Sequence, residues 1–386
     1  MSEPSKVVVS GAPMELVAAS LVCSLGYDLE TACAAARAGL VRPGPAAGFR
    51  TRSAVDGEPE TVSVHAARLL TDGFQDDARL VRLLQGAAAD LRRRLPVPAG
   101  TERIACYLAV PSPQRLLEGA ALVDHESIRT RMAAAAGRAG EVPDPAPGVA
   151  RLLERAWAAA GWTVPAVLAH LAPGGHAGAA ESLARAAADL AAGRIDLAVV
   201  GGVESWLDED TLQWLMDTGR LKCDAHPSGF QPGEAASLLA LRRSSGDDRL
   251  ACLGPVALAQ EPRAAFSGLP SFGEASAATI AAVLQDAEAP AWLLTDLNGE
   301  THRAHEWGST LVRLRAGRPA FDAPVVWTPA ASFGDLGAAT VPVAVCTALR
   351  AAARGAAPAL RAIVRAASDG PDRAAVALTL PRVSAR

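Results

Sequence analysis

Aromatic residues, paired cysteines and an excess of charge of one sign are all scarce in this sequence. Aromatics make up 4% of the 386 residues, so a core has to be packed largely with small aliphatic side chains. The six cysteines are scattered and form no CxxC pair, which excludes a disulfide framework and a zinc site of the usual spacing. We expect these cysteines to be buried, reduced thiols.

The charge balance and the apolar runs exclude further classes of protein. The chain has 37 basic and 41 acidic residues, intermixed along its length, so no basic surplus is available to bind nucleic acid. No apolar run approaches the roughly 18 residues that a membrane span requires. The opening residues MSEPSKVVVSGAP do not resemble a signal peptide, which predicts a cytoplasmic protein.

Half of the residues are apolar, and they are arranged as strands that alternate with helices. Apolar runs predict strands at Lys6–Ser10, Ile104–Val110, Ala166–Ala172, Asp196–Val200 and Ser237–Arg242. Apolar residues at helical spacing predict helices at Met14–Ala38, Asp77–Arg94 and Gly178–Ala192, and the Gly- and Pro-rich stretch Pro43–Pro59 is a predicted loop.

The second part of the chain repeats this order. A strand at Ala323–Trp327, a Gly-rich turn at Ser332–Gly337, a helix at Ala338–Arg354 and strands at Leu360–Ala366 and Ala374–Leu380 are expected. Such alternation predicts a duplicated α/β protein whose sheets are covered by helices. We expect residues 1–245 to form one half and residues 246–386 the other.

The most specific motifs are AVVGGVES, beginning at Ala198, and GFQPGE, beginning at Gly229. Together with KVVVSGAP near the start and GDLGAAT near the end, they make the chain resemble the β-ketoacyl synthases of the thiolase-like superfamily. The resemblance implies a pseudo-duplicated, five-layered αβαβα fold and a dimer formed through the strand near Ala166–Ala172. It also implies ancestral chemistry on acyl thioesters carried by acyl carrier protein or coenzyme A.

The family uses a cysteine at a helix N-terminus, where free N–H groups and a partial positive charge favour the thiolate. Two histidines, or a histidine and an asparagine, assist it. The family spacing places His176 at the cysteine position and Asn298 at the first of the two other positions. Asp335, or alternatively Gly334, takes the second. Asn298 cannot shuttle a proton, and an anionic Asp335 has the wrong sign for stabilising an oxyanion. A decarboxylative condensation is therefore not expected.

Three further departures from the family accompany these substitutions. The family lysine is missing from Pro329–Ala331, the closing Phe loop is replaced by Ala367–Asp372, and Ala235 stands where a third glycine is usual.

Three functions follow from this pattern. The first is a catalytically silent subunit resembling a chain-length factor, which pairs with an active ketosynthase homologue in polyketide or fatty acid biosynthesis. The second is an atypical acyltransferase or thioester hydrolase built on His176, Asn298 and Asp335. The third is a dimeric scaffold or adaptor without acyl chemistry. Expected partners are a ketosynthase homologue or a second copy of the chain, with acyl carrier protein as a further candidate; no cofactor or metal is expected.

Other features have more than one interpretation. The His302-x-x-His305 pair has the spacing of a metal site, but a solvated helix start explains it more simply. Trp206 and Trp214 fit core packing, an acyl tunnel or a dimer face. Gly201–Gly202 follows a strand without a GxGxxG pattern, which favours tight packing over dinucleotide binding.

Overall fold

The computed structural model describes residues 6–95, 102–111, 153–162, 167–246, 251–265, 267–284 and 291–381. Its strands are β1 Val8–Ser10, β2 Met14–Cys23, β3 Gly44–Arg52, β4 Pro59–Val64, β5 Ile104–Ala109, β6 Val167–Ala172, β7 Leu197–Ser205, β8 Glu234–Arg243, β9 Ala251–Gln260, β10 Trp292–Leu294, β11 Val325–Trp327, β12 Arg361–Ala367 and β13 Asp372–Thr379.

The helices are α1 Leu29–Arg37, α2 Arg68–Thr71, α3 Asp76–Arg94, α7 Gly178–Ala191, α8 Glu209–Asp217, α9 Glu274–Val283, α10 Thr301–Arg315, α11 Ala330–Phe333 and α12 Thr340–Ala352. Three short 3-10 turns complete them: η1 Gly175–Ala177, η2 Pro319–Phe321 and η3 Gly337–Ala339. No helix in these described stretches is long and apolar enough to cross a membrane.

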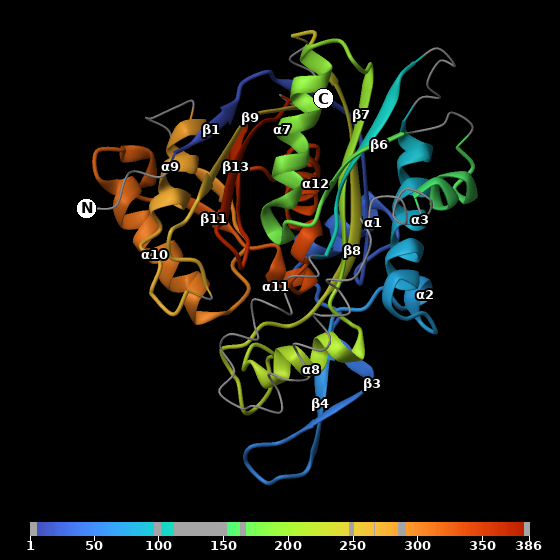
Figure 1. Ribbon diagram of the computed structural model, residues 1–386, viewed down its shortest axis with the longest axis vertical. Helices are drawn as coiled ribbons and strands as arrows, with labels where there is room; N and C mark the ends of the chain where they lie inside the picture. Colours follow the sequence, from blue (N-terminus) through green and yellow to red (C-terminus); the bar gives the residue numbers. More distant parts are fainter. Residues whose placement is uncertain are drawn as a thin grey trace.

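The layers follow one another across the molecule in Figure 1. Helices α9 and α10 cover one wing of the sheet, α7 and α12 lie between the two wings, and α3 covers the other wing (Figure 1). The strand order is β11-β10-β12-β13-β9-β2-β8-β7-β5-β6, and β1 pairs with β9. This arrangement confirms the predicted thiolase-like αβαβα fold.

The two wings repeat one pattern of strand pairing. From each outer edge inward, two parallel pairings are followed by two antiparallel ones, as in β6-β5-β7-β8-β2 and β11-β10-β12-β13-β9. Strand β7 is buried along its whole length, which explains why its sequence is an almost continuous apolar run. The repeat of strands and helices seen in the sequence therefore corresponds to a structural repeat.

Two predicted elements were wrong. The expected helix Met14–Ala38 is strand β2 followed by helix α1, because Met14–Cys23 is enclosed between β8 and β9 in the middle of the sheet. Asp28 then caps α1 by accepting a hydrogen bond from Thr31 N at 2.9 Å. Burial within the sheet outweighs the helical preference of the alanine and leucine residues.

The expected loop Pro43–Pro59 contains β3 and leads into β4, and these strands form a hairpin. The hairpin packs against helix α8 and has a core of its own, to which it contributes Phe49, Val62 and Val64. Figure 1 shows the hairpin extending from the main body below α8.

Trp206 and Trp214 are both 3% exposed and belong to that same cluster, which confirms core packing for the two side chains. Gly202 lies against the second half of the chain: a Cβ there would lie 2.1 Å from the carbonyl oxygen of Ala338. The Gly201–Gly202 pair is thus explained by close packing, as the sequence indicates.

Candidate functional site

The first of the expected site residues lies where strand β6 turns back into helix α7. Gly175 has φ of +60°, a left-handed conformation that suits glycine, and it leads the chain through η1 into the helix. His176 lies in this turn at the N-terminal end of α7 and is 2% exposed. The side chain points into the interior of the molecule and not toward solvent.

Asp335 reaches the same place from the second half of the chain. It follows Gly334, whose φ of +75° and lack of Cβ allow close contact with the His65 ring. His176 Nε2 lies 3.0 Å from each carboxylate oxygen of Asp335. Trp206 Nε1 and Gly337 N also donate to this carboxylate, at 3.1 and 2.8 Å.

Asn298 completes the expected set from the loop after β10. Its Nδ2 donates to Asp335 at 2.7 Å and to Glu300 at 2.9 Å, while its Oδ1 accepts from Glu300 N at 3.0 Å. The structure therefore brings His176, Asn298 and Asp335 together, although they come from three distant parts of the sequence. Asp335 lies at the centre of the group.

Sequence reasoning missed the arginines behind this group. Arg303 on α10 has an Nη2 that lies 3.3 Å from His176 Nδ1, and the same guanidinium donates to Asp369 at 2.7 Å and Asp296 at 3.0 Å. Arg220 donates to Glu300 at 2.6 Å and to Asp369 at 2.9 Å. No motif marks these residues, because most of these contacts join segments that are remote in sequence.

The network continues away from His176. Arg365 binds both Asp296 and Glu306, and Arg373 donates to Glu306 at 2.8 Å. The connected cluster thus contains four guanidinium groups and five carboxylates, all nearly buried: Arg220, Arg303, Arg365, Arg373, Asp296, Asp335, Asp369, Glu300 and Glu306. Buried charges need such partners, because an unpaired one is costly.

The network shifts the protonation of its members. Burial alone would raise the pKa of Asp335, but contacts with His176 and Arg303 hold it well below its usual range. Burial would also raise the pKa values of Asp369 and Glu300, but the charge of Arg220 lowers both. Burial and Arg303 oppose protonation of His176, whereas Asp335 favours it, and the balance raises the pKa of His176.

One group of side chains near this network has the donor atoms of a metal site. Glu300, His302 and Asp369 present ligand atoms within 4.8 Å of one another. Glu300 and Asp369 are, however, both bound by Arg220, so a guanidinium occupies the place between these carboxylates. His305 is exposed and is not one of this group. The donor set does not fit a metal ion.

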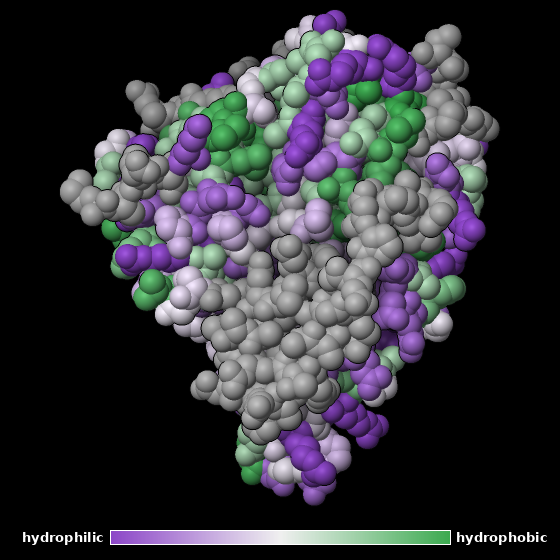
Figure 2. All heavy atoms as spheres, in the orientation of Figure 1, coloured by the Kyte–Doolittle hydropathy of each residue, from purple (hydrophilic) through white to green (hydrophobic). Residues whose placement is uncertain are grey.

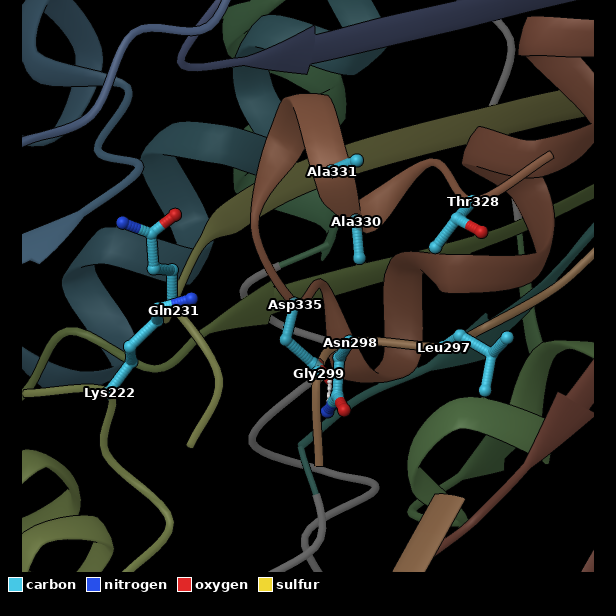
Figure 3. Close-up of a pocket in the computed structure, with 9 residues that line it drawn as sticks. All are labelled: Lys222, Gln231, Leu297, Asn298, Gly299, Thr328, Ala330, Ala331 and Asp335. Atoms are coloured by element: carbon cyan, nitrogen blue, oxygen red, sulfur yellow. Dashed lines mark hydrogen bonds between the residues drawn. The ribbon is translucent and has the colours of Figure 1, made fainter. Parts of the chain in front are cut away.

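A cavity of about 260 Å³ opens over Asn298 and Asp335. Figure 3 shows its walls, formed by the segment after α8, the loop after β10 and the start of α11. The lining residues are Lys222, Gln231, Leu297, Asn298, Gly299, Thr328, Ala330, Ala331 and Asp335. No cysteine is among them.

The cysteines do not line this cavity, and burial makes three of them poor nucleophiles. Burial raises the pKa of Cys23, Cys106 and Cys346 to about 12, far from the value of an activated thiol. Cys223 follows the cavity residue Lys222, but its sulfur lies 3.9 Å from Met216 Sδ in the hairpin core.

Comparisons with known proteins agree with this architecture. No protein-family model and no curated protein sequence matches the chain. Among solved structures, the oxazolomycin ketosynthase domain from Streptomyces albus JA3453 is similar, with a TM-score of 0.67, 14% identity and coverage of 97% of this chain and 75% of that one.

Two further structures match over their whole length. One is the ishigamide ketosynthase/chain length factor, with a TM-score of 0.60, 18% identity and coverage of 96% and 100%. The other is a type II polyketide synthase acyl-carrier protein in complex with its ketosynthase, with a TM-score of 0.67, 14% identity and coverage of 97% and 100%. The chain therefore has the thiolase-like fold of the ketosynthases. Within that fold, Asn298 and Asp335 line the cavity.

Proposed function

We propose that the chain is a non-condensing, ketosynthase-like subunit that pairs with an active β-ketoacyl synthase homologue, in the manner of a chain-length factor. The observation that carries this proposal is the state of His176. It lies at the start of α7, and both of its ring nitrogens already face partners, Asp335 and Arg303. We take this residue as the counterpart of the family cysteine on the spacing of the sequence motifs. The pathway would be polyketide or fatty acid biosynthesis, with acyl carrier protein as a further partner.

Condensation chemistry lacks its essential groups at this site. The acyl chain has no thiol to which it can be transferred, since the lining residues include no cysteine. The carboxylate of Asp335 would oppose the negative charge that develops on a thioester oxygen. An imidazole held between a carboxylate and a guanidinium cannot replace these functions.

Strand β6 supports pairing through the edge of the sheet. Among the described strands, β6 pairs only with β5, and no other described strand covers its second edge. The backbone groups of such an edge can pair with a strand of a second chain. Val167 is 68% exposed at the start of this strand, and Figure 2 shows apolar surface beside the polar residues of α7. The expected dimer through Ala166–Ala172 remains a prediction.

The test is purification of the full chain with a cysteine-containing ketosynthase from the same source, followed by native mass spectrometry. A one-to-one complex supports the proposal. Val167→Asp should weaken it, whereas Val312→Asp, at a position equally exposed on α10, should not. A homodimer or a monomer that does not bind the ketosynthase would instead favour the scaffold or adaptor function. A covalent acyl adduct on this chain, after incubation with acyl-loaded carrier protein, would contradict a silent site.

The hydrolase alternative needs His176 as a general base. Asp335 is placed as an orienting carboxylate would be, but no free lone pair of the ring faces the cavity, because Arg303 approaches the second nitrogen at 3.3 Å. We therefore expect no thioester hydrolysis that depends on His176. Thioester hydrolysis by the parent chain that is lost in His176→Ala would support this alternative.

A further inference from the structure

The cavity beside Asp335 is small and has three separate walls. Its volume of about 260 Å³ lies below the roughly 300–1,000 Å³ of pockets that bind drug-sized molecules. Leu297 is the one large aliphatic residue in its lining. Such a cavity fits a small polar molecule or head group better than a long acyl chain.

The polar groups on the floor of the cavity are already occupied. Asp335 accepts from Trp206, Gly337 and Asn298 and faces His176 through both oxygens. Both amide hydrogens of Asn298 are donated to carboxylates. A ligand would therefore have to be recognised by some other group in the lining.

Lys222 is that group. Its ammonium has no ion-pair or hydrogen-bond partner among the residues that the structure describes. Figure 3 shows the Lys222 side chain extending from one wall in the direction of Asp335 and Asn298. The guanidinium groups of Arg220 and Arg303 behind the floor are bound to carboxylates. The uncommitted charge of the lining is thus positive.

We propose that the cavity binds a small organic anion, a carboxylate or a phosphate ester, with Lys222 as the residue that contacts its charge. The negative charge of Asp335 does not prevent this, because His176, Trp206 and Asn298 surround the carboxylate on its inner side. The inference goes beyond the proposed pairing and does not depend on it.

The composition of the chain allows a direct test. Of its 37 basic residues only two, Lys6 and Lys222, are lysines. Reductive methylation with ¹³C-formaldehyde therefore labels Lys222 at the cavity, Lys6 ahead of strand β1 and the N-terminal amine, and dimethyl-lysine keeps its charge. Inorganic phosphate and succinate are titrated separately into the isolated chain, with sodium chloride at matched ionic strength as the control.

We expect a saturable shift of the Lys222 methyl signal with phosphate, with succinate or with both, and the responding anion identifies the ligand chemistry. Lys6 should stay unchanged. In unmodified protein, calorimetry should show at least about tenfold weaker binding for Lys222→Met, as the loss of one charge-assisted contact predicts. Lys222→Arg and Lys6→Met should bind as the parent does.

Three results would overturn the inference: no saturable shift with either anion, parallel shifts of both lysines, or unchanged affinity in Lys222→Met. Since the titration uses the chain alone, its outcome is separate from that of the co-purification. Anion binding without a ketosynthase complex would reject only the pairing. A complex without anion binding would reject only this inference.

Discussion

Replacement of Arg303 by methionine tests the central feature of the site. Methionine keeps much of the side-chain volume but removes the contacts to Asp369 at 2.7 Å, Asp296 at 3.0 Å and Glu300 at 3.3 Å. Arg303 is 3% exposed, so solvent cannot replace the lost charge. Removing one partner of a buried ion pair costs roughly 3–5 kcal/mol, because the remaining charge stays buried.

The free energy of unfolding should therefore fall by about 3–5 kcal/mol, measured by urea denaturation at pH 7. A matched control is available on the same helix. Arg313→Met removes an ion pair with Glu274 in which the arginine side chain is 44% exposed. The free energy of unfolding should change by at most about 1 kcal/mol.

Equal destabilisation by Arg303→Met and Arg313→Met would contradict this prediction. If Arg303→Met does not fold, Arg303→Lys provides the measurement. Lysine keeps the charge but cannot reproduce the forked contacts of the guanidinium, so it should lie between the parent and the methionine variant.

Three other predictions concern packing, capping and pH. Gly202→Ala should destabilise the chain by about 1–3 kcal/mol, because the new methyl group meets the Ala338 carbonyl, whereas Gly308→Ala in the open face of α10 should stabilise it by about 0.5–1 kcal/mol; thermal unfolding compares the two. Asp28→Ala should cost about 1 kcal/mol by removing the side-chain cap of α1. Asp77→Ala removes an acidic residue from the first turn of α3 but no cap hydrogen bond, so it should cost less, and an equal loss would argue against this cause. The pKa values of Asp335 and its neighbouring carboxylates are lowered in the folded chain, so their contribution to stability should be complete above about pH 5 and fall as the pH drops below about 4; urea denaturation across this range that shows no such loss would contradict the assignment.

Much of the architecture is predictable from the sequence because its strands are apolar runs bounded by glycines. The strands around Ile104 and Leu197 and the helix from Gly178 lie where the spacing of apolar residues indicates. Met14–Cys23 shows where this fails: an Ala- and Leu-containing run has no helical or strand period of its own when every side is buried. The division of the chain near residue 245 stays a prediction.

The site was predictable in part. Family spacing indicates His176, Asn298 and Asp335, and the structure brings them together; that they replace the family's catalytic residues stays a prediction. Arg303 and Arg220 could not be found in the same way, because a chain with so many arginines gives no sign of which ones are buried. Only the folded chain places their guanidinium groups against Asp369.

The position of Arg220 also couples the outer hairpin to the interior. Its guanidinium lies over the rings of Trp214 and Phe230, at 5.3 and 5.4 Å, and its N–H groups donate to Glu300 and Asp369. A movement of α8 with its hairpin would have to draw this cation away from both carboxylates. Opening fluctuations of the hairpin and of the buried charge cluster should therefore occur as one event, and amide hydrogens in the two regions should exchange at similar rates.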